Sequence, residues 1–198
     1  MGFSGHLVFA RSERPLLEAP MFGSTARELT GDIHEWRPRP DGWQTLQLKQ
    51  GLWQDEHLSV LAEWTGAPAC VADVSDSDVA LVTGLDTQGR RWQAWLHLDI
   101  AAALLMEEPE GMDDMSLWIT TPEFEEVLRQ QRAALDAEVP ADAEGALMWA
   151  SAAGVQPLAQ QPRIEELLRG HATFVEELFD LLLDELGFPE ATHSTPKP

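Results

Sequence analysis

Residues 79–98 read Val79-Ala80-Leu81-Val82-Thr83-Gly84-Leu85, then Asp86-Thr87-Gln88-Gly89, then Arg90-Arg91-Trp92-Gln93-Ala94-Trp95-Leu96-His97-Leu98. Two apolar runs thus flank a short polar loop, which is the pattern of a β-hairpin. Gly89 supplies the positive φ angle that such a loop needs. The second run alternates, and its apolar face carries Trp92, Ala94, Leu96 and Leu98. We therefore expect an antiparallel hairpin that buries one face.

Other segments before residue 100 extend this sheet. Strand patterns occupy residues 5–10, 43–48 and 69–74, which together with the hairpin predict four or five strands. We expect residues 11–42, rich in Pro, Arg and Gly, to be mostly loop. Asp55 and Asp99 are each placed to cap a short helix, over residues 56–64 and 100–107.

The second half of the chain has helical periodicity. Thr121-Pro122-Glu123 is a helix start, followed by an apolar stripe to Leu135, and a second helix is expected over residues 143–153. Residues 163–186 predict one long amphipathic helix, with Gly187 at its end. Its apolar stripe consists of Ile164, Leu167, Leu168, His171, Phe174, Val175, Leu178, Phe179, Leu182 and Leu186.

Strands followed by helices favour an α+β fold with an antiparallel sheet. We expect one domain over residues 1–189, strand-rich over 1–99 and helical over 100–189, with helices covering one face of a small sheet. Residues 190–198 are expected to be a disordered tail. The stripe of the 163–186 helix is broad enough to pack on its own sheet or to hold a homodimer together.

Composition excludes several classes of protein. The 198 residues include 34 acidic and 13 basic ones, a net charge of −21, which disfavours direct DNA or RNA binding. No apolar run reaches the length of a membrane span, and a single cysteine cannot form an internal disulfide. The first residues lack an export signal, so a cytoplasmic location is expected.

Catalytic motifs are absent from the sequence. It contains no glycine-rich phosphate loop, no G-x-S-x-G elbow and no paired metal-binding histidines. Cys70 lies in an apolar strand without a basic neighbour, as an inert thiol does. We therefore assign no catalytic residue, no metal ligand and no cofactor, and the sequence favours a protein that is not an enzyme.

Two groups of residues keep an enzymatic alternative open. Asp73, Asp76 and Asp78 place three carboxylates within six residues, which could bind Ca²⁺ or Mg²⁺. A turn between two strands, in which Asp and Ser bond the local backbone, accounts for the same residues. His97 and Asp99 are spaced to share one face of a strand. The alternative is a small metal-dependent hydrolase built on these five residues.

Tryptophan is unusually frequent, with eight residues against seven phenylalanines and no tyrosine. Tryptophan is enriched at binding hot spots because it offers a large apolar surface and one hydrogen-bond donor. The candidate aromatic patch for a partner consists of Trp36, Trp43, Trp53 and Trp95.

Together these features favour a non-enzymatic, acidic protein-interaction module, such as an inhibitor, an immunity-type protein or an adaptor. Residues 101–198 hold 20 acidic and five basic residues, so the expected partner is a protein with a basic surface. A third reading is an acidic mimic of nucleic acid, which requires carboxylates spaced regularly along a surface.

Overall fold

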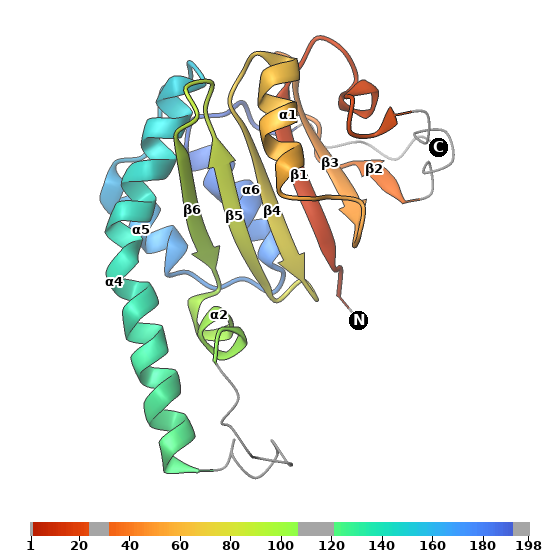
Figure 1. The fold of residues 1–198 in the computed structure, drawn as a ribbon. Coiled ribbons are helices and arrows are strands. Elements are labelled where there is room, and N and C mark those ends of the chain that lie inside the picture. The colour runs from red at the N-terminus through yellow and green to blue at the C-terminus, as the bar shows by residue number, and fades with distance from the viewer. Residues whose placement is uncertain (1, 24–31, 107–120, 192–198) are drawn as a thin grey trace, which may run out of the picture.

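A six-stranded antiparallel sheet forms the centre of the protein, in the strand order β2-β3-β1-β4-β5-β6 (Figure 1). The computed structural model describes residues 2–23, 32–106 and 121–191. The strands are β1 (Gly5–Arg11), β2 (Ile33–Glu35), β3 (Trp43–Lys49), β4 (Ala69–Ser75), β5 (Val79–Leu85) and β6 (Arg91–Leu96). The helices are η1 (Leu16–Glu18), α1 (Glu56–Thr65), α2 (Leu98–Leu104), α4 (Pro122–Ala152), α5 (Gln161–Leu168) and α6 (Val175–Glu185). The α+β class is confirmed, and the sheet is larger than expected.

The expected hairpin is present as β5 and β6. Val82 lies opposite Ala94 in the ladder, and Gly89 has a φ of 79° in the loop. The Asp86 carboxylate closes this loop by accepting hydrogen bonds from the backbone N–H groups of Gln88 and Arg90. Burial alone would raise the pKa of Asp86, but these bonds and the Arg90 guanidinium hold it below its ordinary value.

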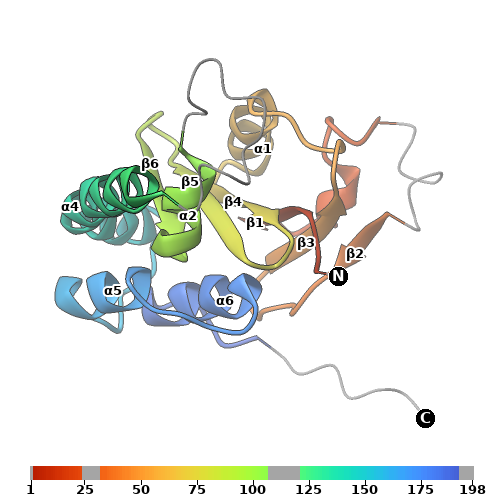
Figure 2. The same cartoon turned by 90° about the horizontal axis from the view of Figure 1, so that it is seen from below.

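Helices lie on both faces of the sheet, whereas we expected them on one (Figure 2). Helices α4, α5 and α6 enclose the larger core, which contains Phe9, Trp43, Trp92 and Trp149. On the opposite face, α1 and η1 cover a smaller core built on Val8 and other residues of β1, β3 and β4. Strand residues alternate between the two cores, as the period of two requires.

The expectation of loop over residues 11–42 is wrong in two places. Residues 16–18 form η1, and residues 33–35 form β2, which pairs with β3 through Ile33 opposite Leu48. A strand of three residues contains too few alternations to produce a sequence signal, so only its pairing with β3 reveals it.

The two helices expected over residues 121–135 and 143–153 form one helix, α4. Pro140 lies in its interior, between the two expected helices, and removes one helical hydrogen bond there. The apolar stripe nevertheless continues past Pro140 through Val139 and Ala143, both buried. Thr121 caps the helix as expected, since its Oγ1 accepts a hydrogen bond from the Phe124 N–H at 3.2 Å.

The single helix expected over residues 163–186 is instead two helices, α5 and α6. A continuous helix would bond the N–H groups of Ala172 and Val175 to its own preceding turns. These groups instead donate to His97 Nε2 at 2.9 Å and to the Ser77 carbonyl at 2.8 Å. Hydrogen bonds from the end of the sheet thus replace helical ones, and Gly170 weakens the helix at the same point.

Helix α2 begins earlier than expected, and Asp99 does not cap it. The residue at the cap position is His97, with a φ of 64°, and Asp99 lies in the first turn. Asp55 precedes α1 as expected but makes no side-chain capping bond. Among the described residues, no helix has the length and apolar character of a bilayer span. Most of the expected tail, residues 192–198, lies outside them.

Candidate functional site

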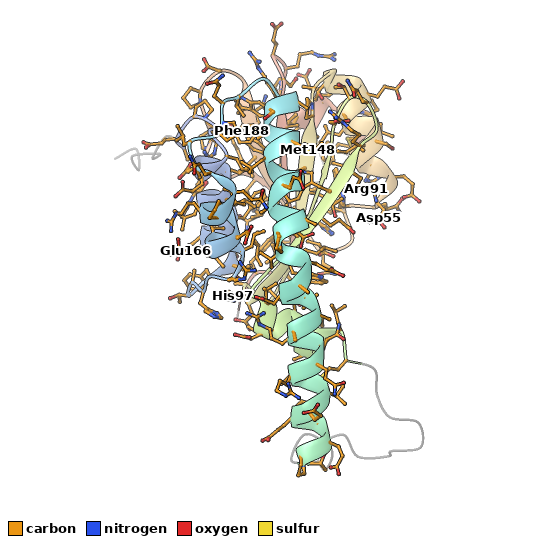
Figure 3. The ribbon with its side chains drawn as sticks, turned by 90° about the vertical axis from the view of Figure 1, so that its left-hand side faces the viewer. Asp55, Arg91, His97, Met148, Glu166 and Phe188 are labelled. Atoms are coloured by element: carbon orange, nitrogen blue, oxygen red, sulfur yellow. The ribbon has the colours of Figure 1, made fainter. Side chains whose placement is uncertain are left out.

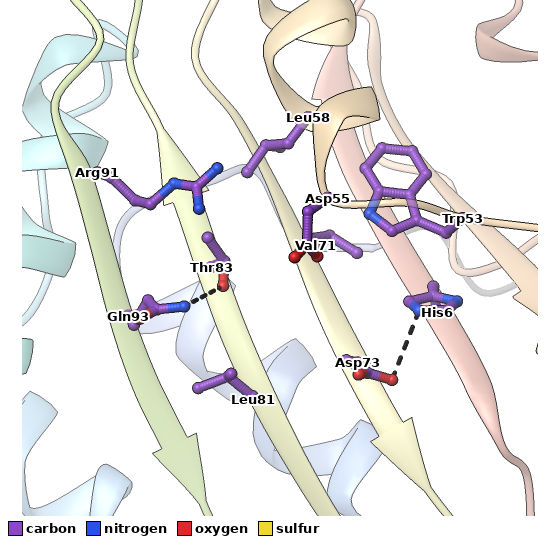
Figure 4. A pocket seen from close by; sticks show the side chains of 10 residues that line it. All are labelled: His6, Trp53, Asp55, Leu58, Val71, Asp73, Leu81, Thr83, Arg91 and Gln93. Atoms are coloured by element: carbon purple, nitrogen blue, oxygen red, sulfur yellow. Dashed lines mark hydrogen bonds and ion pairs between the residues drawn. The ribbon is translucent and has the colours of Figure 1, made fainter. Parts of the chain in front are cut away.

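A pocket of about 120 Å³ opens on the face of the sheet that carries α1 (Figure 4). Helix α1 covers β1 and β4 but leaves much of β5 and β6 uncovered on this side. The pocket lies at the boundary between the covered and uncovered parts. Its apolar walls come from Leu58, Val71 and Leu81, and its remaining wall residues are polar or aromatic.

His6 and Asp73 form one polar wall of this pocket. They face each other on the neighbouring strands β1 and β4, and His6 Nε2 lies 3.5 Å from Asp73 Oδ1. His6 is buried, with 8% of its surface exposed. Burial lowers the pKa of His6, although the nearby carboxylates of Asp73 and Asp55 act to raise it. His6 is therefore neutral at pH 7, and the negative charge of Asp73 stays uncompensated.

Trp53 and Asp55 form the upper wall, where the chain enters α1. Trp53 is 93% buried by its neighbours, with 7% of its surface exposed, and its ring packs beside His6 and His57. In Figure 4 the nitrogen-bearing edge of the indole faces Asp55 and the pocket. The Trp53 Nε1–H has no acceptor within the described part of the chain. An indole N–H that lines a pocket and has no protein acceptor can donate a hydrogen bond to a ligand.

Arg91 closes the pocket from β6. Its guanidinium extends over the sheet toward Leu58 in Figure 4. The neighbouring Arg90 pairs with Asp86, whereas Arg91 forms no ion pair with any described residue. Between Arg91 and the carboxylates, Gln93 Nε2 donates to Thr83 Oγ1 at 3.0 Å, so these two polar groups already satisfy each other.

The four tryptophans of the expected patch do not form one exposed surface. Trp43 is 3% exposed and stacks on Phe9 with ring centroids 4.9 Å apart, inside the larger core. Trp53 belongs to the smaller core on the other face of the sheet. Trp36 and Trp95 are half-buried against the larger core. Two of the four rings thus serve mainly in packing, and binding of a partner by Trp36, Trp43, Trp53 and Trp95 stays a prediction.

The five residues of the enzymatic alternative have separate partners. Asp76 accepts a hydrogen bond from the Gly2 N–H at 2.8 Å, while Asp73 faces His6. Asp78 contacts His97 through its backbone carbonyl, which binds the ring Nδ1, and not through its carboxylate. Asp99 pairs with Arg132 and His171. Across residues 2–23, 32–106 and 121–191, no three His, Cys, Asp or Glu side chains are placed to hold a metal ion.

A second candidate surface lies on the outer side of α6, and we call it the α6 stripe. Phe174 is the extended residue that immediately precedes the first turn of α6, and Leu181 lies within the helix. They are 51% and 50% exposed. Glu177 and Glu185 lie on the same side of α6 as Leu181, and the N–H of the 79% exposed Leu158 donates to the Glu185 carbonyl. The α6 stripe thus consists of Leu158, Phe174, Glu177, Leu181 and Glu185.

The helical layer around the α6 stripe is strongly acidic. Residues 121–191 contain 15 carboxylate side chains against four arginines. Each of these arginines already pairs with a carboxylate of the chain, as Arg163 does with Glu166. Figure 3 views this layer along its edge, with Glu166 of α5 on one side of α4 and Arg91 on the other. The α6 stripe and the sheet pocket therefore face different directions.

Sequence reasoning missed the residues of both surfaces except Trp53 and Asp73. Arg91 and His6 carried no motif, and Phe174 was assigned to the apolar stripe of the expected 163–186 helix, whereas Leu181 lies off that stripe. An available signal was the width of that stripe, since one buried face cannot accommodate every apolar residue of residues 163–186. In comparisons with protein-family models, curated proteins and solved structures, nothing matches this chain.

Proposed function

We propose that this protein is a non-enzymatic interaction module that binds a basic protein partner through the α6 stripe. The observation that carries the proposal is the exposure of Phe174 and Leu181 beside Glu177. Single exposed apolar residues are common on soluble proteins, but two large ones at one helix with a third beyond its end mark a contact surface.

Charge defines the expected partner. Seven of the 15 carboxylates of this layer pair with arginines of the chain, but Glu177 of the α6 stripe forms no ion pair with any described residue and is available to an incoming cation. A partner with Lys and Arg around an apolar centre would match the α6 stripe, with apolar contacts supplying affinity and charge supplying orientation and speed of encounter. An inhibitor, an immunity-type protein or an adaptor would each use such a surface.

The hydrolase alternative lacks a comparable observation. Its histidine is occupied by backbone groups, since His97 contacts the Asp78 carbonyl and the Ala172 N–H. The carboxylates of Asp76 and Asp99 are likewise engaged away from Asp73. A metal-dependent mechanism would need these groups to be rearranged.

The experiment compares proteins captured from the native lysate by the immobilised chain and by a Phe174→Ser/Leu181→Ser variant. Both side chains are about half exposed, so the fold should persist in the variant. A Val60→Ser/Met148→Ser variant is the matched control, because its residues are 37% and 48% exposed on other helices. Captured proteins are identified by mass, and the binding is repeated with purified components.

We expect a protein with a basic surface that the wild type and the control retain and the stripe variant loses. Its binding should weaken at least tenfold at about 0.5 M NaCl, where screening shortens the reach of charge to roughly 4 Å. The proposal would be refuted if all three chains captured the same proteins, or if the binding did not weaken as the NaCl concentration rose.

A further inference from the structure

The pocket between α1 and the open sheet face contains charged groups of both signs that satisfy no partner within the protein. Arg91 lies on one side, and Asp55 and Asp73 lie on the other (Figure 4). Arg91 and Asp55 form no ion pair with any described residue, and Asp73 contacts only His6, at 3.5 Å.

Trp53 adds an independent observation. Its side chain is more than nine-tenths buried, and its Nε1–H faces the pocket without an acceptor. Within the described part of the chain, the buried polar atoms without a partner include His6 Nδ1 and Trp92 Nε1 but not Trp53 Nε1, so the Trp53 N–H is accessible from the pocket and can donate to a molecule there. The pocket therefore offers two donors, Trp53 and Arg91, and two carboxylates, Asp55 and Asp73, to a ligand that carries both an acceptor and a donor.

The register of the sheet separates these groups. Asp73 lies opposite Leu81, and Arg91 lies opposite Leu85, so the two residues are two strands apart and four residues apart along the strands. Strand spacing and rise place their Cα atoms roughly 17 Å apart. Because both side chains extend toward the pocket, a small molecule fits between their charged ends.

We propose that this pocket binds a small zwitterion that carries an ammonium and a carboxylate group, such as a free α-amino acid with a short side chain. The carboxylate takes the hydrogen bonds of Arg91 and the Trp53 indole, and the ammonium lies between Asp55 and Asp73. The pocket volume of about 120 Å³ suits a small ligand, of the size of glycine or alanine. The apolar walls, Val71 and Leu81, face the carbon skeleton.

Ligands with one charge satisfy only half of the pocket. A cation would pair with the carboxylates but would meet the positive charge of Arg91 and leave the Trp53 N–H without an acceptor. An anion would pair with Arg91 but would meet two carboxylates, because burial keeps the nearby His6 neutral. This site does not depend on the α6 stripe, which lies on the other side of the sheet.

The test is a titration of the full ¹⁵N-labelled chain with glycine or L-alanine, observed at the tryptophan indole N–H resonances. The protein has eight such resonances, and a Trp53→Phe variant assigns the one from Trp53. We expect this resonance to shift saturably, with a dissociation constant in the millimolar range for so small a ligand. Acetate and methylammonium, which each carry half of the zwitterion, should bind at least tenfold more weakly.

Variants then locate the site. Arg91→Gln and Asp73→Asn should each weaken glycine binding at least tenfold, while their other resonances show an intact fold. Arg129→Gln and Asp32→Asn are the matched controls, because they change the same residue types on other elements and should bind as the wild type does. An unmoved Trp53 resonance at about 50 mM glycine overturns the proposal, since millimolar affinity would be saturated there. Equal binding of acetate or methylammonium, or full affinity in Arg91→Gln, overturns it as well.

Discussion

Arg39 Nη2 lies 2.5 Å from Asp180 Oδ1, and the guanidinium is completely buried beneath the segment that joins β2 to β3. Arg39 Nη1 also binds Asp184 Oδ1 at 2.6 Å and the Pro189 carbonyl at 2.9 Å. One side chain from a connecting segment therefore ties β3 to α6 and to the residues after it. Because the charges are buried, removing one of them leaves the other without compensation.

We predict that Asp180→Asn lowers the free energy of unfolding by about 3 kcal/mol, because it leaves the buried Arg39 charge only partly paired. Urea unfolding monitored by tryptophan fluorescence measures the change as a shift of the midpoint at constant slope. A double variant, Arg39→Met/Asp180→Leu, should be destabilised less than Asp180→Asn, since it leaves no buried charge unpaired.

Lys49→Ala is the control for this prediction. Its ion pair with Asp32 is exposed, so its removal should change stability by about 0.5 kcal/mol or less. If Asp180→Asn lowered the free energy of unfolding no more than Lys49→Ala does, the buried ion pair would stabilise the fold no more than an exposed one.

Asp142 gives a prediction with a pH dependence. Burial, with the Glu138 carboxylate one helical turn away, raises the pKa of Asp142 to about 6. A raised pKa means that the folded state binds the proton more tightly than the unfolded state. The ionised carboxylate is therefore a cost to the fold, and this cost appears as the pH rises from about 4, the unfolded value, to about 6.

We predict that Asp142→Asn stabilises the protein at pH 7 by about 1 kcal/mol, a value reduced by solvent screening because the side chain is only partly buried. Near pH 4 the difference between variant and wild type should almost vanish. Urea midpoints measured from pH 4 to pH 7.5 test this. Glu144→Gln, a change at an exposed site on the same helix, should show no such trend, and a gain in Asp142→Asn that is constant with pH would contradict the assignment.

The sequence predicts local structure well where the signal is local. The hairpin follows from alternation and Gly89, which are contained within twenty residues. The division of residues 163–186 into α5 and α6 does not, because it depends on hydrogen bonds to His97 and Ser77, which lie about 75 and 100 residues earlier in the chain. Pro140 lies within α4 without ending it, since burial of the residues around it offsets the lost backbone bond.

The pocket could not be predicted for the same reason. His6 and Asp73 become neighbours only because β1 pairs with β4, across β3 and α1 in the sequence. The hairpin pattern correctly places Arg91 on the side of β6 opposite to Trp92. The pattern does not show that α1 leaves this part of the sheet uncovered, because tertiary packing sets the position of α1. Arg39 lies in a segment expected to be loop, where an arginine normally contacts solvent.

His97 connects the end of β6 to the turn between α5 and α6, and it supports the last prediction. Its Nε2 accepts the Ala172 N–H, so the ring proton is on Nδ1, which donates to the Asp78 carbonyl. Its φ of 64° is unfavourable for a residue with a Cβ atom. We predict that His97→Gly lowers the free energy of unfolding by about 2 kcal/mol through the loss of two hydrogen bonds. His97→Ala should lose about 1 kcal/mol more, because it keeps the backbone strain that glycine relieves.

Amide hydrogen exchange and urea unfolding separate the two effects. Both variants should lose protection at the Ala172 N–H, and only the stability should differ between them. His171→Ala is the control for the ring contact, because that side chain is 63% exposed, lies beside the His97 ring with centroids 5.4 Å apart and makes a long contact, 3.5 Å, with Asp99. If His97→Ala were as stable as His97→Gly, the left-handed backbone would carry no strain. If both equalled the wild type, the bonds of Ser77 to Val175 and Glu176 would suffice to hold the turn between α5 and α6.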